Sequence, residues 1–563
     1  MLLNGGPLNS APLNGAGAAS AASEPEYVVA GISFLWRLRV VVGGVDMSAQ
    51  LTGGADVDRE EGAAGVAGFQ LYLPAGPVVP GEWVGRTVAI DYISTKEGVT
   101  TEARRFTGRI AGPPQWDSNN RILSCECSDQ LQQRVEALSI AEIDALTAGQ
   151  WSADVFDPVE GRSRWDYAQE RMSTRTASLD CSPTGELRVT SWYATAPHFA
   201  FGYNTTIDES LSVEWPDLSR LVNTVAIEAD YRYMRLRQQN EAFSWIGGGF
   251  CGWYFSDSKE LPTTAMVRDA VADAGANLLD GYSWDLLPGS APDPCSIGVP
   301  WINYFEAEEL LLGATFTIGR RWAQSVTERY ALNVVVPTSI AAAGEVIERI
   351  GSAFEVESLA AESWADTPFT TGSSSHTDER DDARRVLFLQ VQLHQAVATV
   401  VQAHRGTVLN WQVPTSMVMG IDLVHTILFE DQGARAIGKV VRIADDFGEA
   451  VATTTISIKV MRGGGSVNDP LIPPPSVDEE QPEPTPTPTT LPTQLGGRIG
   501  IDPYDAELPG FAGNYSVTDS GAEMFPRRFD IDAAELPADK RDELPVPITA
   551  TYQVAIPNDL LEL

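Results

Sequence analysis

This 563-residue chain contains five cysteines, whose thiols could bind a metal cluster or form disulfides. Cys125 and Cys127 lie two positions apart in an alternating run, so they project from one face of a predicted strand. Together with Cys181, Cys251 and Cys295 they could hold an iron–sulfur cluster, but their spacing matches no ligand signature. We interpret them as small buried apolar side chains. Five cysteines in so long a chain form no disulfide framework, which indicates folding in the cytosol.

The five histidines also lack a metal-binding pattern. They are His198, His376, His394, His404 and His425, and no HExxH sequence occurs among them. His394 and His404 are predicted to flank one long helix, and we expect structural roles for all five. The chain has no GxSxG, Walker A or dinucleotide-binding glycine pattern in a strand-to-helix context. We therefore predict no enzyme, and no catalytic, cofactor-binding or metal-binding residues.

Acidic and aromatic residues leave one alternative open. With 76 Asp and Glu residues, no pair can be singled out as the acid and the nucleophile of a glycosidase. Fourteen Trp residues occur, and several of them lie between residues 243 and 324, where they could form a platform for sugars. Packing in a core or an interface is the other explanation for these indole rings.

The net charge of −37 restricts the partners of the chain. Binding to phosphate backbones depends on clustered Lys and Arg, so nucleic acids are disfavoured, as are anionic membranes. The charge favours solubility and the spacing of copies in an assembly. The first basic residue is Arg37, so we expect no secretory signal. The most apolar long stretch, Val386–Val401, contains Gln and His, so we expect no membrane span.

Two similar patterns of alternating residues predict the elements around which the chain is organised. The first runs from GEWVGRTVAIDYI (Gly81–Ile93) through FTGRIAGPPQW to RILSCECSD, which ends at Asp129. The second runs from GIDLVHTILFED, which begins at Gly420, through IGKVVRIADDF to TTTISIKVM, which ends at Met461. In each, a Gly turn opens one strand, and a glycine, a base and an aliphatic pair begin the next. We infer an internal duplication of an antiparallel β module.

The fold class that we predict is β-rich α+β, with two tube-like antiparallel β-barrels in one chain and inserted helical and irregular domains. The predicted segments are an N-terminal LNG-repeat arm (1–27), a first β-barrel (28–136), a small α/β insertion (137–203), a strand that returns to the barrel (204–242), an aromatic-rich irregular insert (243–330), a helical segment (331–406), the closing strands of the second barrel (407–465), a Pro-rich linker (466–495) and an extended acidic C-terminal arm (496–563).

Several stretches give more specific expectations. Residues 137–176 carry apolar side chains at helical spacing, and Leu221–Gln238 is typical of a long strand with one apolar and one polar face. Ser339–Phe354 and Asp378–His404 predict two helices, of which the second would span roughly 40 Å. The C-terminal arm has too little apolar material for a firm core, so we expect it to dock on neighbouring subunits.

The order of these elements resembles a known family. FTGRI and RILSCECSD are followed by RWDYAQERMST, then by LRVTSWY, the strand LVNTVAIEADYRY, the helix ARRVLFLQVQLHQA and the return IGKVVRIADDF. This succession resembles the baseplate-hub or tail-hub proteins of tailed bacteriophages. It is especially similar to the large tail proteins of long, non-contractile tails that carry an LNG-type N-terminal repeat. The resemblance covers roughly residues 28 to 463.

The resemblance implies a structural virion protein of the tail tip, made in the host cytoplasm. It implies a homotrimer whose six similar barrels match a hexameric tail tube on one side and a trimeric tip on the other. The implied partners are the tail tube or distal tail protein, the tail-tip or central fibre proteins and, as a further candidate, the tape measure protein. Genomic DNA would pass through an acidic channel without specific binding. The duplicated module independently favours a trimer with pseudo-sixfold symmetry.

Two other functions stay open for the aromatic-rich segment 243–324. It could carry a module that binds a receptor or a glycan at the tail tip. It could also belong to a tail enzyme that cuts peptidoglycan or capsule. Neither alternative has a motif of its own in the sequence.

Overall fold

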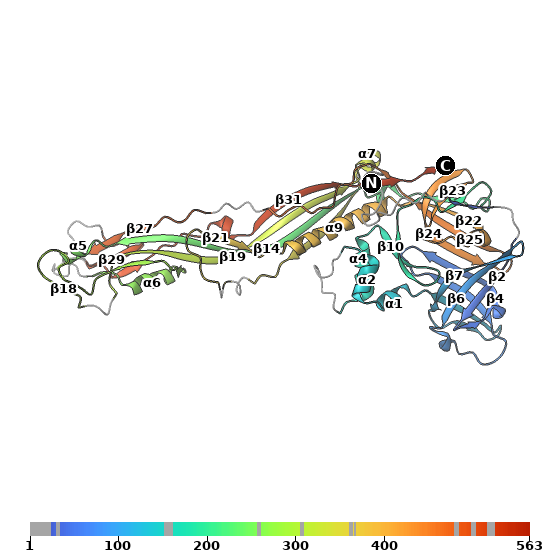
Figure 1. Ribbon diagram of the computed structural model, residues 1–563, viewed down its shortest axis with the longest axis horizontal. Coiled ribbons are helices and arrows are strands. Elements are labelled where there is room, and N and C mark those ends of the chain that lie inside the picture. The colour runs from blue at the N-terminus through green and yellow to red at the C-terminus, as the bar shows by residue number, and fades with distance from the viewer. Residues whose placement is uncertain are drawn as a thin grey trace, which may run out of the picture.

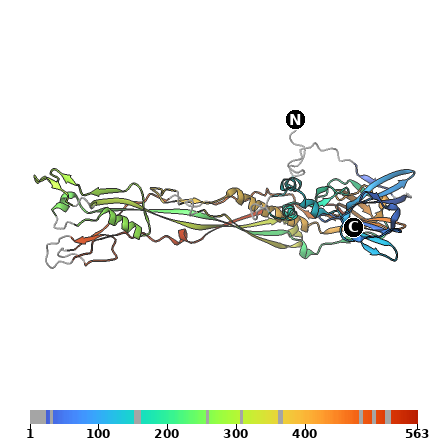
Figure 2. The same ribbon diagram turned by 90° about the horizontal axis from the view of Figure 1, so that it is seen from below.

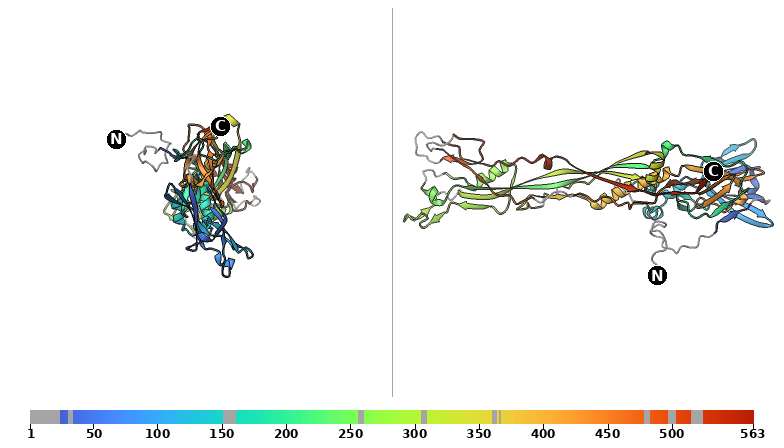
Figure 3. Two further views of the ribbon diagram at one scale, coloured as in Figure 1. Left: turned by 90° about the vertical axis from the view of Figure 1, so that its right-hand side faces the viewer. Right: turned by 90° about the horizontal axis from the view of Figure 1, so that it is seen from above.

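The protein is an elongated molecule with a head, a stalk and a tip (Figure 1 and Figure 2). The computed structural model describes residues 24–29, 34–150, 161–255, 260–304, 309–359, 364, 367–477, 483–496, 503–514 and 524–563. Most of the expected LNG-repeat arm (1–27) therefore lies outside the described residues. Both β modules lie in the head, and the stalk holds the tip far from them (Figure 3). The expected β-rich α+β class is confirmed.

The first β module of the head has six strands in the spatial order β2-β6-β7-β9-β5-β4. Their bounds are β2 (Leu35–Val42), β4 (Leu51–Glu60), β5 (Val66–Tyr72), β6 (Thr87–Lys96), β7 (Val99–Ile110) and β9 (Ile122–Ser128), with the short strands β3 (Val45–Asp46) and β8 (Gln115–Asp117) beside them. Alternating side chains such as Val40, Phe69 and Ile90 are buried in its core. This period of two is what turns the alternating sequence into a sheet with one apolar face.

The second β module has the spatial order β12-β23-β24-β25-β22-β13. Its strands are β12 (Phe199–Phe201), β13 (Ser212–Glu214), β22 (Thr407–Pro414), β23 (Thr426–Asp431), β24 (Ala434–Phe447) and β25 (Ala452–Val460), and β1 (Glu26–Val28) pairs with β12. Trp411, Phe429 and Ile456 are fully buried in its core. Three of these strands match the second alternating pattern of the sequence.

The two modules share one sheet. Strand β4 pairs antiparallel with β24, from Ala55 opposite Phe447 to Glu60 opposite Arg442. Over the described residues this pairing produces a single sheet of sixteen strands. The main order of paired strands thus runs through both modules from β1 to β3 without returning to its first strand. The expected closure into two tube-like barrels stays a prediction.

A glycine occupies the same place in both modules. Gly108 on β7 pairs with Val88 on β6, and Gly438 on β24 pairs with Ile427 on β23. A Cβ atom would lie 2.3 Å from the Ser128 carbonyl oxygen if added to Gly108, and 2.7 Å from the Lys459 carbonyl oxygen if added to Gly438. Each glycine therefore allows the strand after its hairpin, β9 in the first module and β25 in the second, to approach the glycine backbone closely. This shared requirement supports the inferred duplication.

The α/β insertion of the head forms as its helical spacing predicts. It comprises α1 (Leu131–Glu136), α2 (Ile140–Thr147), α4 (Arg164–Ser173), β10 (Ala177–Cys181) and β11 (Leu187–Ser191). Ser139 and Glu142 form a capping box that satisfies the first backbone N–H groups of α2. Ala168 and Met172 of α4 pack against Leu179 of β10 in a separate small core.

The stalk is built on two very long strands, β14 (Thr224–Ile246) and β19 (Leu311–Val335). They pair antiparallel from Thr224 opposite Val335 to Ile246 opposite Gly313. Two predictions are thereby corrected. In segment 204–242 only the short strand β13 joins a head module, whereas the long strand predicted there belongs to the stalk. Segment 243–330 is not irregular throughout, because it contains much of β19. The polar run Gly319–Ser325 in the middle of β19 interrupts its apolar alternation, which hides the strand in the sequence.

The segment 331–406 is only partly helical. It contains α7 (Pro337–Ala343), β20 (Ile347–Glu355), β21 (Ser375–Asp378) and α9 (Asp382–Ala403). The predicted helix Ser339–Phe354 is wrong, because Gly344 has a positive φ of 83° that ends α7, after which β20 pairs in parallel with β14. Its apolar spacing also suits a strand, since Ile350 and Phe354 both pack on the stalk core.

Helix α9 confirms the second predicted helix. In the described part of the chain it is the one helix that is long and apolar enough to cross a membrane, judged by length and composition alone. Its residues Phe388, Leu393 and Val400 are fully buried against the β14 and β19 strands. Its apolar face thus belongs to the core of the stalk.

The tip combines short elements from two distant parts of the chain. From the middle of the chain come α5 (Phe250–Tyr254), α6 (Thr264–Asp273), β15 (Asn277–Leu278), β16 (Ser283–Leu286), β17 (Ser290–Ala291) and β18 (Trp301–Ile302); from the C-terminal part come β27 (Thr489–Leu491), β28 (Thr493–Gly496), β29 (Gly510–Asn514) and β30 (Arg528–Asp530). Trp245, Val267 and Phe529 meet in the tip core.

The C-terminal arm lies along its own chain, which corrects the expectation that it docks on neighbouring subunits. After β26 (Arg462–Gly464) the chain reaches the tip, and β27 pairs with β14 there. It returns through α10 (Ala538–Arg541) and β31 (Leu544–Gln553), which pairs with β19 in parallel. At the head, β32 (Ile556–Asn558) pairs with β26, and β33 (Leu561–Glu562) pairs with β24. The arm has no firm core alone, but Ile548, Tyr552 and Ile556 enter the stalk core.

Candidate functional site

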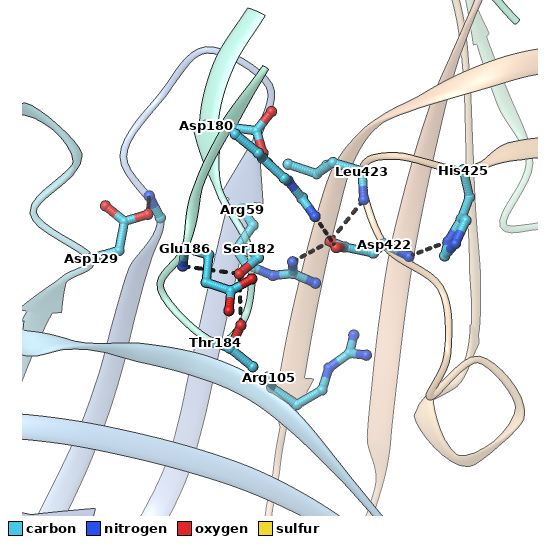
Figure 4. Close-up of polar contacts among 12 residues, drawn as sticks. Arg59, Arg105, Asp129, Asp180, Ser182, Thr184, Glu186, Asp422, Leu423 and His425 are labelled. Atoms are coloured by element: carbon cyan, nitrogen blue, oxygen red, sulfur yellow. Dashed lines mark hydrogen bonds and ion pairs between the residues drawn. The ribbon is translucent and has the colours of Figure 1, made fainter. Parts of the chain in front are cut away.

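The most strongly built polar site of the described residues is a charged junction where the two modules and the α/β insertion meet. We define the charged junction by Arg59 of β4, Arg105 of β7, Arg188 of β11, Asp422 before β23 and Asp445 of β24. In Figure 4, Asp422 lies among side chains from three differently coloured parts of the chain. Charged groups so far inside a protein are stable only when they are paired and hydrogen-bonded.

Arg105 and Asp445 form the innermost pair. The Arg105 Nε donates to Asp445 Oδ2 at 2.7 Å, and its Nη2 donates to Oδ1 at 2.6 Å. The two side chains are 1% and 0% exposed. The Thr454 hydroxyl also donates to Asp445 Oδ1 at 2.6 Å. This bidentate pair fixes the angle between a strand of the first module and a strand of the second.

Asp422 connects the second module to the other two parts. It accepts from Arg59 Nη1 at 2.6 Å and from Arg188 Nη1 at 2.5 Å. Arg188 in turn donates through Nε to Asp180 of β10 at 2.7 Å. Burial alone would raise the pKa of Asp422, but the hydrogen bonds and charges of Arg188 and Arg59 hold it well below its usual range. The carboxylate is therefore kept ionised and serves as a fixed anchor.

A second set of charges lies at the end of β4. Glu61 accepts from Arg405 Nη2 at 2.9 Å and from Lys459 Nζ at 3.1 Å. The Arg405 guanidinium also lies 4.9 Å from the ring centre of Trp192. These contacts join the first module to the residue pair that follows α9 and to β25 of the second module.

His198 and His425 pack against each other beside the charged junction. Their ring centres lie 5.1 Å apart. His425 Nδ1 accepts from the Asp422 backbone N–H at 2.9 Å, and His198 Nδ1 accepts from the Thr426 N–H at 3.1 Å. Burial, followed by the proximity of His198, lowers the pKa of His425 to about 4. His425 is thus a neutral acceptor at physiological pH.

The structure separates the other residues that were considered for chemistry. Cys125 and Cys127 are buried thiols of the first module, and burial raises the pKa of Cys125 to about 12. Cys181 is a buried thiol in the insertion, so these three fit the expectation of small apolar side chains. Cys251 and Cys295 do not, because they form a disulfide at the tip. The five cysteines therefore cannot share one cluster.

The remaining histidines and tryptophans are also accounted for. His394 lies within α9 and His404 follows it, and each donates its Nδ1–H to a backbone carbonyl oxygen one turn earlier. His376 lies on β21 in the stalk. Among the described residues no group of three or more His, Cys, Asp or Glu side chains is placed to hold a metal ion. Trp245 and Trp253 are 1% and 6% exposed, so these two rings form tip core and not an open platform.

Sequence reasoning missed the charged junction although a signal was present. Arg59 follows Ala55 and Val57 at alternating positions, so a cation occupies an inward-facing place on β4. Asp445 likewise stands between Ile443 and Phe447 on the buried side of β24. A charge at an inward position requires a partner. The sequence does not say which one, because the partners are hundreds of residues away.

No protein-family model and no curated protein matches the chain. Among solved structures, it is similar to a tail protein from Neisseria meningitidis MC58, with 11% identity, 75% of this chain and 96% of that chain covered, and a TM-score of 0.36. It is similar to the 43 kDa tail protein of prophage MuSo2 from Shewanella oneidensis, with 9% identity, 75% and 97% coverage and a TM-score of 0.34. A third is the prophage tail protein gp18 from Listeria monocytogenes EGD-e, with 8% identity, 75% and 94% coverage and a TM-score of 0.31.

Proposed function

We propose that this chain is a structural hub protein of a bacteriophage tail, which forms a trimeric ring and joins a hexameric tube to a trimeric tip. The observation that carries the proposal is the pair of β modules with the same strand order and matching glycines, held together in one chain. Three chains would present six similar modules, so one gene product could meet both threefold and sixfold partners. The element order of residues 28–463 supports the same function through its resemblance to tail hubs.

The charged junction supports a role in which geometry matters. A hub must keep its two modules at one fixed angle if both are to meet equivalent subunits of a tube. The Arg105–Asp445 pair and the shared strand pairing of β4 with β24 supply that rigidity. The net charge of −37 suits a channel through which DNA slides without adhering, since like charges repel.

The contact between chains must differ from the contact within a chain. Strand β23 covers β24 only as far as Lys439, which leaves Arg442–Phe447 free to pair with β4. In the first module β6 pairs with β7 from Val99 to Arg109, so the corresponding edge is occupied. A neighbouring chain therefore cannot repeat the β4–β24 pairing there. We expect module contacts within a chain and module contacts between chains to alternate around the ring. The ring then has exact threefold and approximate sixfold symmetry.

Imaging of intact particles along the tail axis tests this proposal. We expect averaged density with threefold symmetry at one level of the tail tip, and two quasi-equivalent modules per chain within it. The mass of the ring, measured on purified tails, should equal three chains. A single copy per particle, or a ring of six whole chains, would contradict the proposal.

A further inference from the structure

The stalk sheet has one protected edge and one unprotected edge. Near the head its strands follow the order β31-β19-β14-β20. On β31, Pro545 and Pro547 remove backbone donors, and both backbone groups of Gln553 bond to Asp469. The nine residues of β20 (Ile347–Glu355) contain no proline and pair with β14 without a register shift. A regular edge of this kind is a template for a further strand.

The hydrogen bonds at the two ends of β20 show which of its backbone groups point outward. The Val346 carbonyl oxygen accepts from the Thr224 N–H, and the Val356 N–H donates to the Arg232 carbonyl oxygen. Alternate residues of a strand bond to the same neighbour, so the even-numbered residues of β20 bond to β14. The backbone groups of the odd-numbered residues therefore point away from β14, and no described residue bonds to them. These residues are Ile347, Arg349, Gly351, Ala353 and Glu355.

The space beside these outward groups is open. All five odd-numbered residues of β20 are exposed, and Ile347 is 48% exposed. Nothing lies within 4 Å of a Cβ atom added to Gly351, at the centre of the strand. Gly351 and Ala353 also present little side-chain bulk. An extended polypeptide can therefore approach the edge of β20 closely enough to form hydrogen bonds.

A groove borders this edge on the side of the stalk core. Ile350 and Phe354 pack in that core together with residues of α9, so by alternation Glu348 lies on the same side of β20. Glu348 lines a groove of about 370 Å³, whose other walls include Thr399 of α9 and Trp192, which follows β11 of the insertion. Figure 1 shows α9 along the stalk strands, with α4 of the insertion beside it. An added strand would place alternate side chains over this groove.

The lining of the groove favours a neutral side chain. Trp192 and Val222 contribute apolar surface, and Ala398 is small. Arg220 and Glu348 are one base and one acid, so the groove favours neither sign of charge. When a peptide adds to a sheet edge, its main chain supplies affinity and pockets for alternate side chains supply selectivity.

We propose that the β20 edge binds an extended segment of another protein, which adds a strand to the stalk sheet and places an apolar side chain in the groove. The row of outward N–H and C=O groups matches a polypeptide backbone, and not a lipid, a sugar or a nucleic acid. Because β31 is protected, two stalks could pair only through β20 of each, which gives a twofold dimer. That argument against a second copy rests on the proposed threefold ring, whereas strand addition itself does not.

Prolines on β20 test the proposal in the full chain. Gly351→Pro with Ala353→Pro removes two outward donors and leaves the pairing with β14 intact, as Pro545 and Pro547 do for β31 beside β19. Gly351→Ala with Ala353→Val is the matched control, because both residues keep their N–H groups. The probe is a fluorescent peptide of the same length as β20 that alternates Val with Thr and ends in one Lys and one Glu.

We expect the proline variant to bind the Val/Thr peptide about tenfold more weakly than the natural chain, because two backbone hydrogen bonds are lost. The control should bind within about twofold. Thr399→Phe, which fills the groove, should weaken binding about threefold. Two further peptides carry N-methyl groups on their odd or on their even residues. One should lose binding and the other keep it, because only one edge of the peptide faces β20.

Hydrogen exchange followed by mass spectrometry locates the binding site. In the free chain about half of the β20 amides should exchange fast, because they point outward, and the Val/Thr peptide should slow them. The amides of Thr224–Arg232 should keep their rates in the proline variant, which shows that β14 stays paired. If the proline variant misfolds, the two N-methylated peptides still test the proposal on the natural chain.

Several results would overturn the proposal. One is equal affinity of the proline variant and the natural chain for the peptide, and another is equal binding of both N-methylated peptides. Unchanged exchange of β20 at millimolar peptide would also contradict it. Slow exchange of all β20 amides in the free chain would show that the chain covers this edge itself. A mass of two chains that falls to one in the proline variant would identify a second copy as the occupant.

Discussion

At the scale of single residues, the head depends on charges that are buried but paired. Arg105 and Asp445 are separated by 340 positions in the chain, yet they form a bidentate contact with almost no exposure to water. Asp422 is shared by arginines from the first module and from the insertion. Each of these groups lost its hydration on folding, so removal of one partner leaves the other without compensation.

Replacement of Asp445 by Asn tests this cost. We expect Asp445→Asn to lower the free energy of unfolding of the head by about 3–5 kcal/mol, because the Arg105 charge stays buried without a counter-charge. Urea unfolding followed by Trp fluorescence measures the loss. Asp58→Asn is the control: Asp58 pairs with Arg442 at 2.6 Å, but the two side chains are 32% and 49% exposed. There we expect less than about 1 kcal/mol. Equal losses in both variants would contradict the interpretation.

The stability of the head should fall in mild acid because of His425. Its pKa is about 4 in the folded chain, whereas an unfolded histidine has a pKa of about 6.5. As the pH falls through about 6.5, the unfolded state binds the proton first, so folding is disfavoured increasingly until about pH 4. The full shift would correspond to roughly 3 kcal/mol, and partial exposure of the ring reduces it to about 1–2 kcal/mol.

Thermal melting between pH 7 and 4.5 measures this effect. In His425→Asn the side-chain oxygen can still accept the Asp422 N–H, but the residue no longer titrates. We expect the variant to lose less of its melting temperature over this pH range than the natural chain does. An identical pH dependence in both proteins would exclude His425 as the source.

At the scale of elements, the two modules are similar but not equal. Strand β6 of the first module has 10 residues, whereas the corresponding strand β23 of the second module has only 6. Because β23 is short, part of the edge of β24 stays uncovered by it, and β4 pairs there. The glycines Gly108 and Gly438 have kept the same role in both. Both modules thus share the close approach of three strands, and the shorter hairpin of the second module leaves room for the contact between modules.

Substitution of Gly438 by Ala tests the close approach. The added methyl group would meet the Lys459 carbonyl oxygen at 2.7 Å, which neighbouring backbone cannot easily relieve. We expect a loss of about 1–3 kcal/mol in the unfolding free energy of the head. Gly351→Ala on β20 is the control, because nothing lies within 4 Å of its added Cβ. A neutral Gly438→Ala would show that β25 can move away.

At the scale of the whole molecule, the C-terminal segment connects the head with the tip and returns. Its strand β31 adds an outer strand to the stalk beside β19. Pro545 and Pro547 lie on that strand, and the N–H donors that they lack make further strand addition unfavourable, as is typical of a sheet edge. The chain therefore closes the open edge of its own stalk.

Hydrogen exchange can show that β31 protects the stalk. Ile548 is 7% exposed in the stalk core, so Ile548→Asp should detach β31 and speed the exchange of amides in Val326–Val335, which pair with it. Amides of Leu311–Ile318, near the tip, should keep their rates. Thr549→Asp, one residue along and exposed, is the control and should change little. Unchanged exchange in Ile548→Asp would mean that the stalk does not need the arm.

Local pattern in the sequence already determined the elements whose signals lie close together in the chain. Alternation predicted the three strands that end each module, apolar spacing predicted α9, and the composition determined the acidic surface. These features depend on neighbouring residues, which periodicity records directly.

Only the tertiary structure decided which distant residues became partners. It paired Arg105 with Asp445, Cys251 with Cys295, β14 with β19, and the C-terminal arm with its own stalk. It also made a strand of Ile347–Glu355, where helical spacing was equally compatible with the residues. The physical reason is that local spacing does not record a contact between residues far apart in the chain. Such a contact forms where packing, charge and hydrogen bonding of the whole chain are satisfied together.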